Sequence, residues 1–333
     1  MTITNLPHRR APRRLLSLAL VAGLLAPTAT PALAQSYPDR PIRLIVPFGP
    51  GGGTDLVARL VAEKATQILG KSVVVENRAG GGGTVGILAL TQARPDGYTL
   101  AICPPICATA PSLYNPAPFD PARAFAPVST LVDLPLVLVA RKDLGVTDAQ
   151  GLLAKARSTP QGLSYASPGA GSSNHLAAET LRRAAGVEMT NIPYRSGAAA
   201  LTDVVSGRVD IYFDTVASAL PQVRNGAVVA LGVTGRARTT QLPEVPTLGE
   251  AGLPGFETSP SALLVAPAGT PAPIIERLNA VFREALADAA TTRRVVDTGA
   301  EPVGSTAVNT AAYLAGETAR LGQLIRENKI TAD

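Results

Sequence analysis

The chain has 333 residues, of which 46 % are apolar, 30 are Lys or Arg and 25 are Asp or Glu. Residues 1–34 contain four arginines and no acid, so the rest of the chain carries 26 basic and 25 acidic residues, a net charge of +1. A near-neutral chain gives no electrostatic reason to expect a nucleic-acid partner or an anionic membrane surface, and its apolar content is sufficient for a large core.

The first 34 residues have the order of a secretory signal peptide. Four arginines precede an apolar run at 15–26 and the small-residue sequence Ala32-Leu33-Ala34. The run is shorter than the roughly 20 residues that span a bilayer. We therefore expect a periplasmic protein that starts near Gln35. No cysteine lies near the cleavage point, which argues against a lipid anchor, and the sequence leaves the export route, Sec or Tat, open.

After Gln35, short β-branched runs alternate with amphipathic helical runs, which favours an α/β fold with mostly parallel sheets. The first series predicts a βαβαβ unit, with strands at 41–48, 72–77 and 98–103 and helices at 54–69 and 84–93. Thr54 or Asp55 is expected to be the N-cap of the first helix, with Gly70 just past its end.

A second series follows a predicted strand at 134–140, which we interpret as leaving the first lobe. Its predicted elements are strands at 163–167, 188–194, 209–213 and 228–234, helices at 173–185 and 198–206, and a helix near Leu220. A Pro-rich connection then leads to a strand at 262–266 and long C-terminal helices. This order indicates two α/β lobes joined by returning chain, whose ligand should bind beyond the carboxyl ends of the strands.

Three glycine-rich loops, at 47–55, 77–86 and 167–175, each lie between a predicted strand and a predicted helix. Glycine lets backbone N–H groups approach a ligand, and the first turn of a helix has unsatisfied donors. Such loops favour an anion, and a carboxylate suits them. A tight turn that needs only positive φ is the alternative interpretation.

The sequence gives little support for a nucleotide-binding site, a catalytic site or a metal site. Gly81, Gly83 and Gly86 match the G-x-G-x-x-G spacing, but no acid lies about 20 residues further on to bind a ribose. His175 is the single histidine after residue 34, and the serines before it lack a G-x-S-x-G elbow. We therefore expect no catalytic residues, no metal and no cofactor, because no metal-ligand spacing surrounds the histidine or the cysteines.

Cys103 and Cys107 are separated by Pro-Pro-Ile. In an oxidising compartment they could form a disulfide, but an extended segment would hold their Cα atoms too far apart. The sequence leaves the bridge open, because it would require a tight turn.

Short motifs occur in order along nearly the whole chain after Gln35. They are YPDRPI at 37–42, IVPF at 45–48, PGG at 50–52 with Thr54 and Asp55, VENR at 75–78, PDGYTL at 95–100, PYR at 193–195, VPT at 245–247, EAGLPGF at 250–256 and APAGTP at 266–271. In these motifs the chain resembles the tripartite tricarboxylate transporter substrate-binding receptors, the Bug (Bordetella uptake gene) family.

The resemblance implies an α/β, two-lobed periplasmic-binding-protein fold of the Venus flytrap type II, with a mixed sheet in each lobe. The expected parts are a signal peptide at 1–34, lobe 1 at 35–138 and 235–333, and lobe 2 at 139–234. The implied function is that of a monomeric receptor, which captures a small organic carboxylate and delivers it to membrane permease subunits. The alternatives are a receptor for a signalling system and, less favoured, an enzyme on the same scaffold.

In the family, the Pro-Gly-Gly loop of lobe 1 and the Gly-Ser loop of lobe 2 grip the carboxylate of the ligand. The corresponding residues here are Phe48, Gly51, Gly52, Thr54, Asp55, Gly82, Thr84, Ser167, Gly169, Gly171 and Ser172. Asp214 takes a place that varies with the ligand in the family, so it could receive an amine or hydroxyl, or could only cap the next helix.

This chain departs from the family pattern around the predicted pocket. Ser196 follows Pro-Tyr-Arg where the family usually has glycine, and Ala199 stands where a proline is usual. Pro260-Ser261 stands where a tryptophan usually precedes the Ala-Pro-Ala-Gly-Thr-Pro motif. These changes bear on the identity of the ligand, and the carboxylate grip is unchanged.

Overall fold

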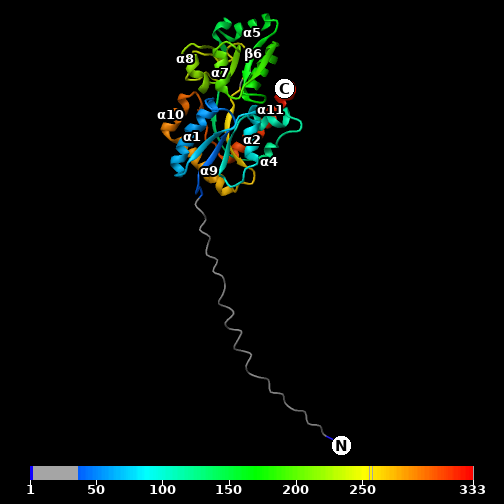
Figure 1. The fold of residues 1–333 in the computed structure, drawn as a ribbon, viewed down its shortest axis with the longest axis vertical. Coiled ribbons are helices and arrows are strands. Elements are labelled where there is room, and N and C mark those ends of the chain that lie inside the picture. The colour runs from blue at the N-terminus through cyan, green and yellow to red at the C-terminus, as the bar shows by residue number, and fades with distance from the viewer. Residues whose placement is uncertain (3–36, 255, 257, 333) are drawn as a thin grey trace. The chain divides into compact units, whose positions relative to one another are not determined.

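Figure 1 shows the fold of the computed structural model, which describes residues 1–2, 37–254, 256 and 258–332. Apart from its first two residues, the predicted signal peptide lies outside the described residues. From Pro38 onward the chain builds two mixed sheets with helices on both faces of each, which confirms the predicted two-lobed α/β fold.

The first sheet has six strands in the order β11-β4-β10-β3-β1-β2. Its parallel strands are β1 (Ile42–Val46), β2 (Val73–Asn77) and β3 (Thr99–Cys103). The antiparallel strands are β10 (Ser261–Pro267), β4 (Phe125–Asp133) and β11 (Glu301–Pro302). Leu44 of β1, which lies between β3 and the edge strand β2, is opposite Val75 and Leu100, and its complete burial explains the apolar run in this segment.

Helices cover both faces of this sheet (Figure 1). One face packs against α1 (Gly53–Leu69), α9 (Ala272–Ala287) and α10 (Ala289–Asp297). The other packs against α2 (Thr84–Thr91), α3 (Ile106–Leu113) and α11 (Ala307–Glu327), with the short α4 (Pro121–Ala124) beside α11.

The second sheet has five strands in the order β7-β6-β8-β5-β9. They are β5 (Leu136–Arg141), β6 (Leu163–Ser167), β7 (Met189–Pro193), β8 (Ile211–Thr215) and β9 (Val228–Val233). Alternate residues of β5 enter two different cores. Leu136 and Leu138 pack towards α5 (Ala149–Ser158) and α6 (Ser173–Ala185), whereas Val137 and Val139 pack towards α7 (Gly197–Val205) and α8 (Val216–Arg224).

The predicted strand at 134–140 differs from the structure in its place. The predicted strand at 134–140 leaves the first lobe, but the structure places β5 within the second sheet and the preceding β4 within the first. The chain changes sheets at Leu134 and Pro135, because proline has no N–H group to continue a ladder.

The predicted lobe limits, 35–138 with 235–333 and 139–234, stay a prediction, although the sheets suggest different ones. Besides the earlier crossing at residue 134, the connection after β9 packs its apolar side chains onto the second sheet. These side chains are Leu242, Val245, Leu248, Leu253 and Phe256.

Three segments that run between the sheets are hydrogen-bonded to one another. Leu134 N–H donates to the Pro260 carbonyl at 2.8 Å, and Thr258 N–H donates to the Thr234 carbonyl at 2.9 Å. Thr234 N–H in turn donates to the Leu136 carbonyl at 2.9 Å. Three hydrogen-bonded crossing segments therefore join the lobes. A hinge motion between the lobes would change the backbone angles of these segments.

Helix α3 is not predicted from the sequence, because it is short and contains Pro111. Its first turn resolves the question of the two cysteines. Cys103 ends β3 and Cys107 lies in the first turn of α3, so their Cα atoms are 5.9 Å apart and the two sulfurs are bonded. The tight turn that the bridge requires is the strand-to-helix turn itself.

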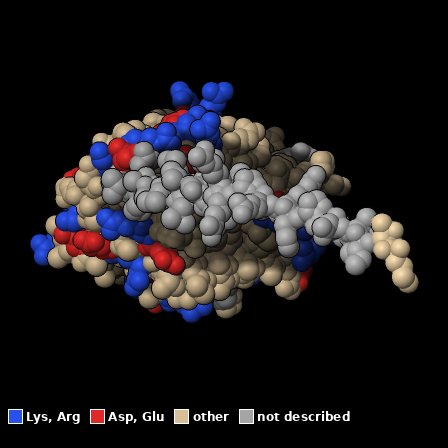
Figure 2. Space-filling view, turned by 90° about the horizontal axis from the view of Figure 1, so that it is seen from below, with Lys and Arg blue, Asp and Glu red and all other residues tan. Residues whose placement is uncertain are grey.

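The surface has no single sign of charge on the face seen in Figure 2, where Lys and Arg side chains are interspersed with Asp and Glu. No helix among the residues that the structure describes is long and apolar enough to cross a bilayer.

Candidate functional site

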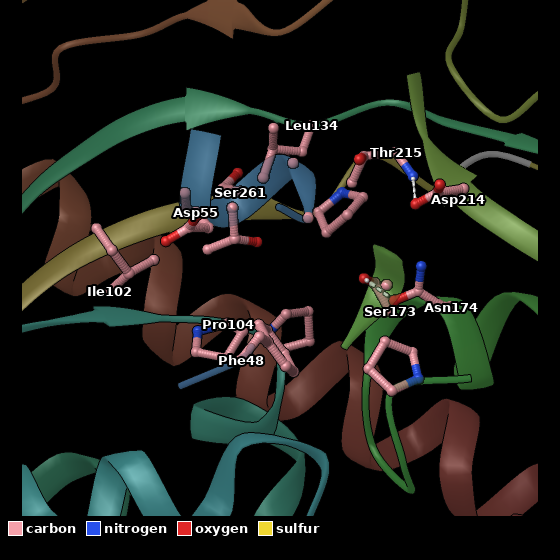
Figure 3. Close-up of a pocket in the computed structure, with 18 of the residues that line it drawn as sticks. Phe48, Asp55, Ile102, Pro104, Leu134, Ser173, Asn174, Asp214, Thr215 and Ser261 are labelled. Carbon is pink, nitrogen blue, oxygen red and sulfur yellow. Dashed lines mark hydrogen bonds between the residues drawn. The ribbon is translucent and has the colours of Figure 1, made fainter. Parts of the chain in front are cut away.

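A cavity of about 40 Å³ lies between the two sheets (Figure 3). Its walls come from strand ends, from helix starts and from the crossing segments. The described residues that line it are Phe48, Gly52, Gly53, Thr54, Asp55, Ile102, Pro104, Pro105, Leu134, Pro168, Ser173, Asn174, Gly197, Tyr212, Asp214, Thr215, Pro260, Ser261 and Ala262. Polar groups thus line a largely apolar cavity, as in many small-molecule sites.

Four helices begin at this cavity. Gly53 and Thr54 open α1 from the first lobe, and Ser173 and Asn174 open α6 from the second. Gly197 opens α7, and Thr215 is the N-cap of α8. The first N–H groups of a helix have no partner within it, and its N-terminus carries a partial positive charge. The cavity therefore presents donors and favourable dipoles to an anion from both lobes.

The loop before α1 owes its shape to Asp55. The helix is capped by Gly52 and not by the predicted Thr54 or Asp55, because Gly52 is the extended residue and Asp55 lies within the first turn. The Asp55 carboxylate accepts the N–H of Gly51 at 3.0 Å, Arg59 Nε at 3.0 Å and Asn77 Nδ2 at 2.8 Å. Burial raises the pKa of Asp55, but the hydrogen bonds from Arg59, Gly51 and Asn77 outweigh it and hold the pKa below its usual value.

The two lobes touch around the cavity. Gly49 N–H donates to the Arg195 carbonyl at 3.2 Å. A Cβ atom on Gly53 would lie 2.2 Å from Thr215 Oγ1, and one on Gly82 would lie 2.0 Å from the Ala170 carbonyl oxygen. The lobes are therefore closed on each other, and glycine is required at both positions for this close approach.

In the second-lobe loop, the Ser172 hydroxyl bonds within the loop and the Ser167 hydroxyl bonds to Asn191 of β7. Ser172 is the N-cap of α6, accepts His175 N–H at 3.3 Å and donates to the Gly169 carbonyl at 2.7 Å. Ser167 Oγ donates to Asn191 Oδ1 at 2.8 Å. These bonds hold the turn that presents Ser173 and Asn174 to the cavity.

His175 and Glu179 have structural partners. His175 is buried, its Nδ1 accepts the N–H of Gly171 at 3.3 Å, and burial lowers its pKa, so the imidazole is neutral. Glu179 accepts the hydroxyl of Tyr165 at 2.9 Å and pairs with Arg182 at 2.9 Å. These bonds account for both side chains within the second-lobe core.

Asp214 is the penultimate residue of β8 and is 2 % exposed. Its Oδ1 accepts the N–H of Thr215 at 2.8 Å, whereas Oδ2 has no hydrogen-bond partner in the described part of the chain. Burial raises the pKa of this carboxyl to about 7, and the Thr215 N–H and the nearby hydroxyls of Ser218 and Tyr212 lower it by less. The N-cap of α8 is Thr215, whose Oγ1 accepts Ser218 N–H at 3.3 Å, so the capping alternative for Asp214 does not account for it.

Five of the twelve predicted ligand-binding residues line the cavity: Phe48, Gly52, Thr54, Asp55 and Asp214. The others support its walls. Gly51 donates to Asp55, Gly82 and Gly169 pack against each other across the lobes, and Gly171 packs against Ile106 and Leu113. Ser167 and Ser172 brace the second loop, as described above, and Thr84 Oγ1 is buried without a partner among the described residues.

Sequence reasoning missed Tyr212, Thr215 and Ser261 as lining residues, as well as the apolar wall of Ile102, Leu134, Pro104, Pro105 and Pro168. Ser261 belongs to a departure from the family pattern noted in the sequence, and Thr215 could have been found as a helix cap after Asp214. The remaining residues come from β3 and the turn after it, from the loop after β6, from β8 and from the crossing at 134, and no local signal brings these segments together.

Comparison with known proteins places the chain in a family. A family described as "Tripartite tricarboxylate transporter family receptor" matches residues 57–330. The protein of the tcbD-tcbE intergenic region of Pseudomonas sp. strain P51 is 40 % identical over 319 residues, which cover 94 % of this chain and 95 % of that relative. Protein BugT of Bordetella pertussis is 36 % identical over 319 residues, with 94 % and 97 % covered.

Two solved structures from Rhodopseudomonas palustris are also similar. One, described with adipate, has a TM-score of 0.85 and 34 % identity, covering 89 % of this chain and 99 % of its own. The other, MatC with bound malate, has a TM-score of 0.82 and 33 % identity, covering 87 % and 100 %. Fold, sequence and coverage agree, and the chain is therefore a solute-binding receptor that belongs to the Bug family of tripartite tricarboxylate transporter receptors.

Proposed function

We propose that this receptor is a non-catalytic, periplasmic protein that captures a small organic carboxylate between its lobes and delivers it to the membrane permease of a tripartite transporter. The observation that carries the proposal is the meeting of helix N-termini from both lobes, those of α1 and α6, at one closed cavity. Aligned backbone dipoles and first-turn N–H groups suit a carboxylate.

The carboxylate would be held by backbone amides and hydroxyls. None of the described residues that line the cavity is Lys or Arg, so no side-chain cation competes for this role. The proposed contacts are the first turn of α1 with Thr54, and the first turn of α6 with Ser173 and Asn174. The remaining predicted residues, Gly51, Gly82, Thr84, Ser167, Gly169, Gly171 and Ser172, would shape and brace these two turns. The similar receptors with malate and adipate support this class of ligand.

The described side chains that line the cavity do not form a nucleophile–base pair. A serine nucleophile needs a base within hydrogen-bond reach, and none of the described lining residues is His, Cys or Lys. Asp55 is paired with Arg59 and Asn77, and its lowered pKa makes it a poor general base. Asp214 has a pKa raised to about 7, but within the described residues it is hydrogen-bonded to neither lining serine, Ser173 or Ser261. Binding and release are thus the chemistry that the cavity supports best.

Closing around the ligand would follow from contacts that both lobes make only when they are together. A ligand that touches α1 and α6 binds the closed form more tightly than the open one, and so shifts the population towards closure. The cavity is far below the roughly 300 Å³ of ordinary ligand pockets, so the lobes must open to admit a ligand and close around it less tightly than in this structure.

Thermal unfolding of the purified mature chain tests this function. A panel of mono- and dicarboxylates, aromatic acids and amino acids is added at saturating concentration, with the corresponding amides as controls. At least one acid is expected to stabilise the protein by about 2.7 kcal/mol at a hundredfold excess over its Kd. Its amide should not. The proposal fails if no acid in the panel raises the melting temperature, or if acid and amide act equally.

The predicted cellular setting is tested separately. Fractionation of cells that express residues 1–333 should recover the processed chain, starting near Gln35, in the periplasm. Light scattering on the purified chain should give the mass of a monomer. A chain retained in the cytoplasm with residues 1–34 attached would contradict the proposed location.

A further inference from the structure

The second lobe places a carboxyl group at the cavity, and one of its two oxygens has no hydrogen-bond partner within the described residues. Asp214 is 2 % exposed and lines the cavity, and its Oδ2 has no hydrogen-bond partner within the described residues. A buried acceptor without a partner is costly, so native proteins rarely keep one without a reason. The ligand is therefore a candidate source of the missing hydrogen-bond donor.

The surroundings of Asp214 supply hydrogen bonds but no cation. Thr215 N–H donates to Oδ1, the hydroxyls of Tyr212 and Ser218 approach the carboxyl, and the N-terminus of α8 begins beside it. These contacts do not offset the burial, because the pKa of the carboxyl remains raised. No Lys, Arg or His is found among the described residues that line the cavity.

The other carboxylate at the cavity has its charge matched. Arg59 lies 2.9 Å from Asp55, and Asn77 and Gly51 occupy further sites on its oxygens. The cavity therefore contains one neutralised carboxylate and one that has no cation of its own. A ligand that brings only negative charge would repel the ionised form of Asp214, since like charges in a dry site repel strongly.

We propose that Asp214 binds an ammonium group of the ligand, so that the solute is an amino carboxylate whose carboxylate lies at the helix N-termini and whose ammonium donates to Asp214 Oδ2. This inference rests on the proposed function. A ligand hydroxyl would supply the missing hydrogen bond but would leave the charge of Asp214 unmatched, whereas an ammonium supplies both.

The test compares matched acids that differ in one substituent. Two series are used, propionate with lactate and alanine, and succinate with malate and aspartate, each measured by isothermal titration calorimetry on the mature chain. The amino member of at least one series is expected to bind about 10- to 100-fold more tightly than the unsubstituted and hydroxy members. Asp214→Asn should remove this advantage and should bind the unsubstituted acids more tightly than the native chain does.

Asp203→Asn is the matched control, because it removes a carboxyl from the same lobe that pairs with Tyr194 and Arg208 outside the cavity. It should keep the native preference. The inference is overturned if hydroxy or unsubstituted acids bind most tightly, or if Asp214→Asn weakens all members of a series equally; the proposed function would survive both results. If no member of either series, and no acid of the wider panel, binds at all, the proposed function itself fails.

Discussion

The two walls of the cavity each place a buried aspartate near the start of a helix, and they treat it in opposite ways. Asp55 in the first lobe is bonded to Gly51, Arg59 and Asn77, and its pKa is lowered. Asp214 in the second lobe keeps one oxygen without a partner, and its pKa is raised to about 7. The same side chain is thus a brace where donors converge on it and an open acceptor where they do not.

The two aspartates therefore have different roles within one site, one structural and one in ligand recognition. The first wall is a loop whose shape is set before any ligand arrives, because its charge is already matched by the protein. In the second wall, Asp214 Oδ2 has no hydrogen-bond donor within the described residues, and a ligand can supply one. Three substitutions test the comparison, each with a different measurement.

Removal of the brace should have the largest effect. Asp55→Ala leaves the Gly51 N–H and the Asn77 amide without their acceptor and Arg59 without its partner. We expect the free energy of unfolding of the ligand-free protein, measured by urea denaturation, to fall by about 3 kcal/mol. Arg59→Ala should cost less, since the Arg59 side chain is half exposed and the other two donors remain. Equal stability of Asp55→Ala and the native chain would contradict the role of Asp55 as a brace.

A substitution that keeps the two lobes apart should weaken ligand binding. A Cβ on Gly53 would meet Thr215 Oγ1 at 2.2 Å, so Gly53→Ala should hinder closure while the open form accepts alanine in its helix. Overpacking of about 1 to 3 kcal/mol corresponds to about a 5- to 150-fold weaker affinity for the tightest ligand of the panel. Calorimetry measures this loss. Gly316→Ala, on α11 with open space around it, should bind as the native chain does. Native affinity in Gly53→Ala would show that the closed contact at this position is not needed for binding.

The third prediction concerns the pH dependence of stability at Asp214. Its folded-state pKa of about 7 lies above the unperturbed 3.8, so the folded protein binds the extra proton between these values. Its contribution to stability therefore falls as pH rises from about 4 to about 7, and the loss persists above that range. Asp214→Asn lacks this titration and should be more stable than the native chain at pH 8, but not at pH 4. Unfolding curves at both pH values measure the difference. A variant that loses stability at pH 8 would indicate that Asp214 is a brace like Asp55.

Much of the local structure follows from the sequence. The helix at 173–185 and the strand at 163–167 are predicted with the bounds that the structure has, because Ser172 caps the helix, Gly186 ends it and the strand has a clear apolar pattern. The start of α1 is predicted correctly to within one residue, but its cap is not, because the side chain of Asp55 reaches back to Gly51 in a way that the sequence pattern does not distinguish from capping.

The sequence by itself determined the α/β alternation, the glycine loops at helix starts, and the motifs that assign the family, since all of these depend on residues close together in the chain. The tertiary structure alone decided which residues share the cavity. Asp214 became an open acceptor because β8 ends beside α7 and faces α1, and Leu134 and Pro260 entered the wall because the chain changes sheets there. Periodicity tells which face of an element is buried, whereas the partner of that face, and the polar group left without one, depend on segments that meet only when both sheets are assembled.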